Sequence, residues 1–318
     1  MCLFKVIAFR NKSTFLHRAC YSNMQSRVVI AGGSGTVGSY LQKSFVKEGW
    51  EVHIISRNGG DAQWNNELSM IHAINGSTML INLAGKSVQC YFNEKNRNAL
   101  LTSRVETTSI LNRIVAQCDR PPQLWLNASG GSIYNENETV AHGEDSPANG
   151  TSVMADVARK WEEVFFSESV GDVRKVALRI SLVLDRLGGV LPMYSALAKL
   201  WLGGKQGSGD QLISWIHVHD FFEICKFILS HESIVGCVNL AAPQVILNSD
   251  FMRCIREAHH RSFGFPAPTF ALKLAAPIVG FDTELILNHL SIAPKKLLQN
   301  GYVFQHETLQ SALDDLVL

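Results

Sequence analysis

Three glycines at a spacing of three residues, Gly32, Gly35 and Gly38, are the residues whose arrangement points most directly to chemistry. They follow the apolar run 27–30 and lead into an amphipathic segment that starts at Ser39. A strand, a glycine turn and a helix in this order form a diphosphate site, because the free N–H groups at the helix start attract an anion. Gly32 would allow the tight turn, Gly35 the approach of the diphosphate, and Gly38 close packing of the helix on the strand. We therefore predict a dinucleotide site made of Gly32, Gly33, Ser34, Gly35, Thr36, Val37 and Gly38.

The end of the next expected strand, 51–57, discriminates between the two nicotinamide dinucleotides. An NAD site usually has Asp or Glu about 20 residues after the glycines, where the carboxylate binds both ribose hydroxyls. Here Ser56 and Arg57 take that place, and no acid lies between Glu51 and Asp61. A carboxylate would repel a 2′-phosphate, whereas a guanidinium binds it with paired hydrogen bonds. We predict NADP(H); the alternative is that Arg57 is only a solvated loop cation.

The composition bears on which other classes of partner the chain could have. The chain has 318 residues, of which 46% are hydrophobic and 18% charged, and its formal net charge is +1. This near-neutral charge gives no indication of nucleic-acid binding, and no apolar run reaches the roughly 18 residues of a membrane span. The seven cysteines form no CxxC pair, and the eleven histidines show no zinc-site spacing. We predict reduced thiols, no metal, no nucleic acid and no membrane, and leave homodimerisation open.

Alternating strand and helix patterns place these residues in an α/β protein, a Rossmann-type doubly wound parallel sheet. Continuous apolar runs such as 79–84 indicate strands covered by helices on both faces. After about residue 262 the pattern changes to short helical segments punctuated by prolines, with a strand signal only at 302–304. The expected strands are 27–32, 51–57, 78–84, 123–128, 174–184 and 236–241, and the expected helices are 37–48, 94–118, 151–168, 190–201, 219–231 and 249–260.

The chain is expected to divide into three parts. Residues 1–23 contain basic but no acidic residues and suit a mitochondrial presequence. The alternative, which we favour, is a cytoplasmic protein that begins near Met24. Residues 24–250 are predicted to form the NADP-binding domain, and residues 251–318 a small helical domain that contributes to the substrate cleft.

Two further strand ends should line the same crevice, because ligands of an open α/β sheet bind outside the carboxyl ends of its strands. One is the segment 127–131. The other consists of Asn82, Leu83, Ala84 and Gly85. Lys86 follows Gly85 directly and is either a phosphate or substrate contact or a surface lysine.

The whole pattern resembles the short-chain dehydrogenase/reductase superfamily of extended type. More narrowly, it is similar to the epimerase-family proteins related to nucleoside-diphosphate-sugar epimerases. The resemblance covers roughly 27–318, and its most distinctive motifs are Ser-Trp-Ile-His-Val-His-Asp at 214–220 and the tail at 293–304. It implies an NADP(H)-dependent oxidoreductase or epimerase-like enzyme for a small polar or sugar-like substrate.

By that resemblance, catalysis would use a serine, a tyrosine and a lysine. The serine polarises the substrate oxygen, and the tyrosine transfers a proton with its pKa lowered by a lysine one helical turn later. Ser129 takes the position of the serine, but Met154 and Ala158 stand where the tyrosine and lysine are expected. Tyr134 either replaces the missing acid or packs beside the cofactor. The resemblance therefore leaves the activity open.

Other polar residues have weaker claims to a role. A second YxxxK pattern, Tyr91 to Lys95, follows the wrong strand, and Lys160 points to a different helix face from residue 158. Asp220 is expected to cap the helix near 221, and the side chains of the loop 135–150 are expected to be solvated. Candidate contacts on the substrate side are Arg179, Gln211, Trp215 and His217, the last alternatively a structural histidine.

Two functions from different classes stay open. The first is the NADP(H)-dependent enzyme with an atypical active site. The second is a non-catalytic NADP(H)-binding sensor or regulatory protein, which the missing tyrosine and lysine favour.

Overall fold

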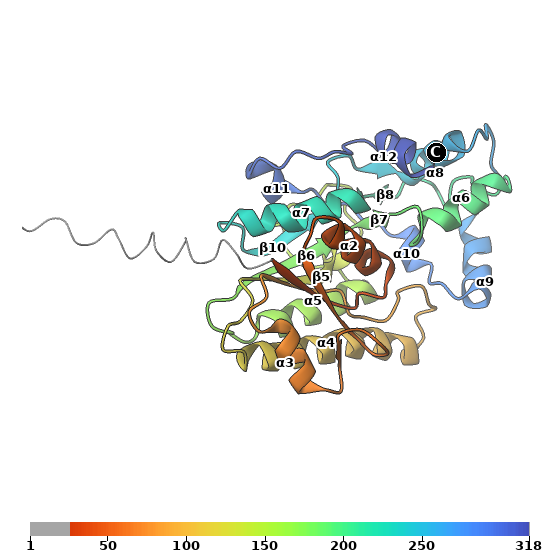
Figure 1. The fold of residues 1–318 in the computed structure, drawn as a ribbon. Helices are drawn as coiled ribbons and strands as arrows, with labels where there is room; N and C mark the ends of the chain where they lie inside the picture. The colour runs from red at the N-terminus through yellow and green to blue at the C-terminus, as the bar shows by residue number, and fades with distance from the viewer. Residues whose placement is uncertain (1–25, 318) are drawn as a thin grey trace, which may run out of the picture.

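Seven strands form the central sheet of the computed structural model, which describes residues 26–317 (Figure 1). Their spatial order is β10-β6-β5-β4-β1-β2-β3, and every neighbouring pair is parallel. The connections leave in opposite directions on the two sides of the β1–β4 pair, which opens a crevice at the carboxyl ends of these strands. The strands are β1 (Arg27–Ala31), β2 (Glu51–Ser56), β3 (Ala62–Gln63), β4 (Met79–Asn82), β5 (Leu124–Gly130), β6 (Arg174–Ile180) and β10 (Gly236–Leu240).

Helices cover both faces of this sheet. Leu41, Phe45 and Phe221 bring α2 and α7 onto one face, and Met70 and Leu111 belong to the cluster on the other face. The innermost strands are buried on both sides, which is why β1 and β4 read as continuous apolar runs. The helices are α2 (Thr36–Lys47) and α7 (Val218–Ser230) on the first face, and α3 (Glu67–Ile74), α4 (Glu94–Ala116) and α5 (Val153–Phe166) on the second.

A third hydrophobic cluster joins segments that are distant in sequence. Trp215, Phe251 and Leu313 bury their side chains where α6, α8 and α12 meet. Figure 1 shows these three helices together, with α9 at the edge of the molecule. The elements of this region are β7 (Leu182–Leu184), α6 (Leu191–Lys199), β8 (Leu212–Ile213), β9 (Trp215–His217), β11 (Ile246–Leu247), α8 (Asn248–Ala258), α9 (Thr269–Val279), α10 (Glu284–Leu287), α11 (Lys295–Gln299) and α12 (Leu309–Val317).

The predicted doubly wound sheet and the helical C-terminal region are confirmed, and several details differ. The short elements β3 and α3 were not predicted, and the expected strand 174–184 is interrupted at Ser181. The strand signal at 302–304 does not correspond to a strand, because Tyr302 and Phe304 insert into the core beside α7 instead of pairing with a strand. Part of the loop 135–150 is buried.

The third cluster draws residues from both sides of the predicted boundary at residue 250. That boundary therefore stays a prediction. Among the described residues, no helix combines the length and the apolarity needed to cross a lipid bilayer. The presequence expected in 1–23 lies outside the described residues, so the compartment stays a prediction as well.

Candidate functional site

The glycine turn between β1 and α2 is packed so closely that it excludes side chains at two positions. Gly32 has a φ of +84°, and a Cβ there would lie 2.8 Å from the backbone of Leu83 and Ala84. A Cβ on Gly38 would lie 2.7 Å from Gly33 Cα and 2.8 Å from Gly32 O. These contacts hold the end of β1 against the end of β4 and bring the first turn of α2 over the crevice.

The N-terminus of α2 is open to a ligand. Gly35 is the N-cap residue; no side chain caps the helix there, and the first turn has no acidic residue. Ser34, Gly35 and Thr36 are exposed. The backbone N–H groups of such a turn lack partners inside the helix and carry the positive end of the helix dipole. The segment can therefore hold an anion such as a diphosphate.

Beside this turn, the end of β2 presents one free cation. The Ser56 hydroxyl is buried and contacts the carbonyl groups of Asn58 and Gly59, so it shapes the loop. Arg57 is exposed and makes no ion pair with any residue in 26–317. The nearest following acid, Asp61, accepts a hydrogen bond from Ile54 N at 2.8 Å. The guanidinium of Arg57 is thus available to a phosphate, whereas Ser56 can offer little more than its backbone.

At the end of β4, the structure separates buried from accessible residues. The Asn82 side chain is buried and donates to Thr108 Oγ1 at 3.1 Å and to Asn127 Oδ1 at 2.7 Å. Its Oδ1 accepts from Ala84 N, so this side chain shapes the turn and does not reach the crevice. Leu83 is half-buried, and Gly85 is exposed.

A buried arginine supports the segment that follows. Arg104 donates to the carbonyl groups of Leu100 at 2.9 Å and Lys86 at 3.1 Å, and it stacks over Trp161. Burial lowers the pKa of Arg104 to about 10, so the side chain stays charged at neutral pH. Lys86 itself is half-buried, and Ser103 accepts a hydrogen bond from its backbone N. The Lys86 segment is therefore held firmly at the edge of the crevice.

The end of β5 is tied to β6 and α5 by a buried polar network. The Ser129 hydroxyl donates to Glu162 Oε1 at 2.7 Å, and Arg179 binds the same carboxylate through two nitrogens at 2.9 and 2.8 Å. Arg179 also donates to the Tyr134 hydroxyl at 2.7 Å, which in turn donates to Asn239 at 2.8 Å. Burial lowers the pKa of Arg179, but the hydrogen bonds and charge of Glu162 outweigh this effect and leave the pKa raised.

This network makes proton chemistry at the two predicted catalytic residues difficult. Ser129 directs its proton toward a carboxylate, away from any substrate oxygen. Burial raises the pKa of Tyr134, although the neighbouring Arg179 opposes the shift. A general acid works best with a pKa near the operating pH. The geometry gives both residues a structural role, and the packing interpretation of Tyr134 fits its burial.

A second serine near the same strand end was not selected from the sequence. Ser132 lies in the short 3-10 turn η1 (Gly131–Ile133) and is half-buried. A Cβ on Gly130 would lie 3.1 Å from Ser132 Oγ and 3.6 Å from Ala158 Cβ, so the hydroxyl and the buried face of α5 both border Gly130 at the end of β5. The Ser132 hydroxyl makes no hydrogen bond to another described residue. Strand alternation was the missed signal, because it puts Ser129 on the same face as the buried Asn127.

No lysine or tyrosine takes over the missing pair on α5. Ala158 is buried, and Lys160 pairs with Asp156 at 3.0 Å on the exposed face. Tyr91 and Lys95 are both exposed; Tyr91 lies just before α4, and Lys95 lies in its first turn. Their YxxxK spacing is thus a surface feature.

The expectation that the loop 135–150 is solvated is wrong for two of its residues. His142 is buried and stacks on Tyr134 with ring centroids 5.2 Å apart. The Glu144 carboxylate accepts from Asn239 N at 2.9 Å and Lys296 N at 3.1 Å, so it joins the C-terminal region to β10. Asp145 is exposed, as expected.

The residues predicted to face the substrate from the distal side are buried among protein groups. Trp215 lies in the core, and Gln211 donates to the carbonyl groups of Gln206 at 2.9 Å and Ile286 at 3.0 Å. Arg179 is occupied by Glu162. The prediction that these three side chains touch a substrate does not fit their burial.

His217 has a structural role at the start of α7. Its Nδ1 accepts a hydrogen bond from His219 N at 3.0 Å, which makes His217 the N-cap residue. The prediction that Asp220 caps this helix is wrong. Asp220 lies inside the first turn and accepts hydrogen bonds from Tyr302, Gln305 and His306.

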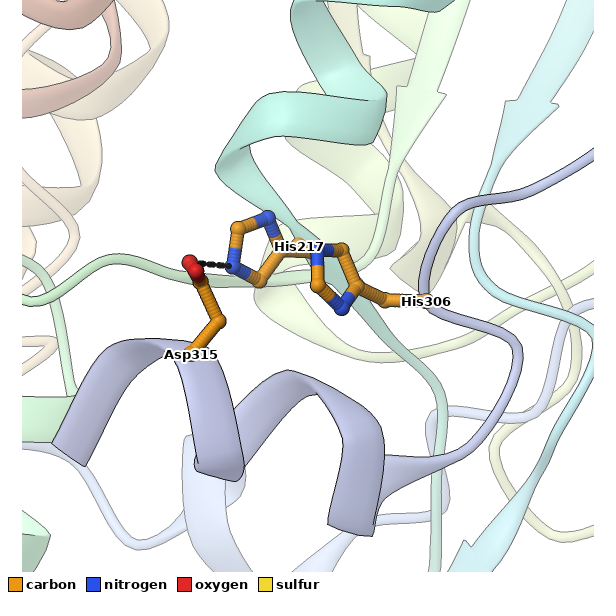
Figure 2. A group of neighbouring side chains, drawn as sticks. All are labelled: His217, His306 and Asp315. Atoms are coloured by element: carbon orange, nitrogen blue, oxygen red, sulfur yellow. Dashed lines mark ion pairs between the residues drawn. The ribbon is translucent and has the colours of Figure 1, made fainter. Parts of the chain in front are cut away.

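Figure 2 shows His217 beside His306 and Asp315, a group whose ligand atoms lie within 4.8 Å of one another. The two imidazoles stack with centroids 3.9 Å apart. Since His217 Nδ1 accepts a hydrogen bond, the neutral ring carries its proton on Nε2. That nitrogen lies 3.2 Å from Asp315 Oδ2 without the alignment of a hydrogen bond. A metal ligand needs a lone pair, so this tautomer does not favour a metal, and the absence of a metal stays a prediction.

The stability of the protein is expected to fall between pH 6.5 and 4 because of His217. Burial, together with His306, lowers the pKa of this imidazole to about 4, whereas the unfolded chain titrates near 6.5. Between these pH values the unfolded state binds more protons than the folded state. The contribution of neutral His217 to the free energy of unfolding is therefore complete above pH 6.5 and is lost as the pH falls toward 4. Its size is up to about 3 kcal/mol.

His217→Asn retains a good cap and should flatten the pH dependence of urea unfolding. A curve as steep as that of the wild type would contradict the assignment, and exposed His260→Asn is the control.

Comparison with known proteins adds a family to this geometry. Residues 28–159 match the model of the NAD dependent epimerase/dehydratase family, and residues 267–316 match a domain of unknown function, DUF1731. The epimerase family protein SDR39U1 of Mus musculus is 30% identical over 298 residues, which cover 92% of this chain and 99% of the relative. The epimerase family protein YfhF of Bacillus subtilis is 29% identical over 300 residues, 91% of this chain and 97% of the relative.

A solved structure extends the similarity to three dimensions. The crystal structure of human epimerase family protein SDR39U1 (isoform 2) with NADPH matches with a TM-score of 0.82. The sequence identity is 27%, and the match covers 92% of this chain and 99% of that chain.

Proposed function

Because the chain belongs to the NAD-dependent epimerase/dehydratase family, we propose that it binds NADP(H) in the crevice between β1 and β4. The diphosphate lies over residues 32–38, and Arg57 binds the 2′-phosphate. Residues 83–85 line the crevice through their backbone and the Leu83 side chain. The Asn82 and Ser56 side chains do not contact the dinucleotide; their hydrogen bonds shape the turns that do. This assignment keeps the segments predicted from the sequence and changes the role of two side chains.

One observation carries the proposal: the exposed, uncapped start of α2 lies beside an arginine without an ion-pair partner among residues 26–317. The fit to the cofactor can be tested at Gly35, where a Cβ would meet only Gly32 O, at 3.6 Å. The space above Gly35 is therefore open to a ligand. The human relative crystallised with NADPH supports the same choice of dinucleotide.

Arg57→Ala is expected to weaken NADPH binding by about tenfold or more and to leave NADH binding nearly unchanged. The reason is that only NADPH has the 2′-phosphate, and a charge-assisted hydrogen bond contributes about 1.5–3 kcal/mol. Tryptophan fluorescence titration of the purified protein with each dinucleotide measures the effect. Arg253→Ala, which removes the same charge from an exposed position on α8, is the matched control. Equal weakening for both dinucleotides would assign Arg57 another role.

The chemistry that fits this family is hydride transfer, which NADP(H) supplies when bound. We propose Ser132, in place of Ser129, as the hydroxyl that polarises the substrate oxygen, because it makes no hydrogen bond to the described protein. Lys86 is the second polar side chain beside the crevice and fits a substrate with phosphate or carbonyl oxygens. A small polar or sugar-like carbonyl compound is the class of substrate that these groups suit.

The second candidate function is a non-catalytic NADP(H) sensor. The observation that favours it is the pair Met154 and Ala158, where a proton donor and its lysine would stand. Absorbance at 340 nm, recorded with NADPH and a panel of sugar nucleotides and small carbonyl compounds, discriminates between the two. Turnover that Ser132→Ala lowers while binding persists supports the enzyme, and tight binding without turnover of any compound supports the sensor.

A further inference from the structure

An apolar surface lies at the edge of the molecule where two distant segments run side by side. Trp201 O accepts from Phe265 N at 2.7 Å, and Lys205 O accepts from Ala267 N at 2.9 Å. Helix α9 follows directly and forms the outer edge of the molecule in Figure 1. The apolar patch consists of the exposed side chains Leu200, Trp201, Leu202, Phe263, Phe265, Phe270, Leu274, Ile278 and Val279.

Helix α9 is apolar on two opposite faces. Leu272 and Ala276 are buried against the protein. Phe270, Leu274 and Ile278, spaced four residues apart on another face, are 70%, 70% and 86% exposed. Single exposed apolar residues are ordinary, but three of them along one face of a helix, beside further exposed aromatic and aliphatic residues, favour an interaction surface. The patch therefore needs an occupant.

The charged residues within the two segments that carry the apolar patch have one sign. The segments 187–209 and 258–281 contain Lys199, Lys205, Arg261 and Lys273 and no aspartate or glutamate. The three lysines are exposed, and Arg261 lies over the Trp201 ring at 5.1 Å. The occupant should therefore be both apolar and negatively charged.

The acids closest in sequence to α9 are directed into the protein. Asp282 accepts a hydrogen bond from Phe92 N at 3.0 Å, and Glu284 accepts from Val153 N and Met154 N at 3.1 Å. On α8, Asp250 and Glu257 pair with Arg253. The exposed Asp210 follows the first segment, but among residues 26–317 no ion pair joins an acid to Lys199, Lys205, Arg261 or Lys273, so the rim of the patch keeps a net positive charge.

We propose that the apolar patch docks on the surface of an anionic lipid membrane, with α9 lying in the interface. Tryptophan, phenylalanine and aliphatic residues insert at the level of the headgroups, and lysines around them attract anionic lipids. A second copy of the chain is disfavoured, because a symmetric interface would bring lysines of the same sign together. The prediction of no membrane partner was based on the lack of a spanning segment, and this surface changes it, because interfacial binding needs no such segment.

Flotation of the full chain with lipid vesicles tests the proposal. Vesicles of phosphatidylcholine with roughly 30% phosphatidylglycerol should carry the protein upward, and phosphatidylcholine alone should carry much less. Leu274→Ser/Ile278→Ser should reduce the floated fraction by about tenfold or more, because both side chains leave the interface. Lys273→Glu should weaken binding to the anionic vesicles in particular. About 1 M salt should reduce the charge-dependent part.

The matched control is Leu68→Ser/Val303→Ser, two side chains that are 79% and 78% exposed outside the apolar patch. It should float like the wild type, and unchanged NADPH titration of each variant shows that the fold is retained. Wild-type protein that stays unbound to anionic vesicles would overturn the proposal. So would a dimer in light scattering that Leu274→Ser/Ile278→Ser dissociates, since the patch would then be a self-association surface.

Discussion

Replacing Arg179 by methionine is expected to lower the free energy of unfolding by about 3–5 kcal/mol, the largest stability effect of any substitution considered. Arg179 binds both oxygens of Glu162, and both side chains are buried, with 6% and 8% of their residues' surface exposed. Without the guanidinium, the carboxylate keeps its desolvation cost and loses its counter-charge. Ser129 and Cys237 remain near it but are neutral.

A double variant shows how much of the lost unfolding free energy comes from the unpaired Glu162 carboxylate and how much from lost packing. Glu162→Leu combined with Arg179→Met removes both charges and should recover most of the lost stability, because a buried ion pair contributes little over an apolar pair of similar volume. Urea denaturation of the single and double variants measures this. Arg253→Met, which breaks the exposed ion pairs with Asp250 and Glu257, should cost less than about 1 kcal/mol. A double variant as unstable as Arg179→Met would show that packing dominates.

Gly38→Ala is expected to give the largest loss of NADPH binding, roughly a hundredfold, together with destabilisation. Alanine normally stabilises a helix by about 1 kcal/mol relative to glycine. Here its Cβ would lie 2.7 Å from Gly33 Cα, a backbone atom that can only move with the turn. Overpacking of this kind costs about 1–3 kcal/mol. Displacing the turn misaligns the N–H groups of α2, and each charge-assisted hydrogen bond lost costs about 1.5–3 kcal/mol.

Gly35→Ala is the control that separates the fold from the ligand. The added methyl group meets only Gly32 O at 3.6 Å, and the φ of −75° suits alanine, so the unfolding free energy should stay within about 0.5 kcal/mol. NADPH binding should nevertheless fall, because the methyl group enters the space assigned to the diphosphate. Thermal melts and titrations of both variants give the comparison. Unchanged NADPH binding by Gly35→Ala would place the diphosphate elsewhere.

Local sequence carries enough information for the sheet and the glycine turn. The spacing of Gly32, Gly35 and Gly38, and the apolar runs that become β1 and β4, depend on backbone sterics and burial within a few residues. These short-range rules hold wherever the rest of the chain lies. The lack of an acidic residue after β2 is also a local feature, since it can be read directly from the residues at 52–60.

Only the tertiary structure decided which polar side chains are free. Ser129 and Ser132 follow the same strand, and the choice between them depends on Glu162, 33 residues from Ser129 and directed to it by α5. Asn82 likewise bonds to Thr108 and Asn127, and His217 stacks on His306, through contacts that strand and helix patterns do not encode. The sequence by itself determined the family, the sheet and the dinucleotide turn, because local packing and backbone geometry specify them. Burial and long-range hydrogen bonds assigned the remaining polar residues, because a side chain's partner depends on where distant segments meet.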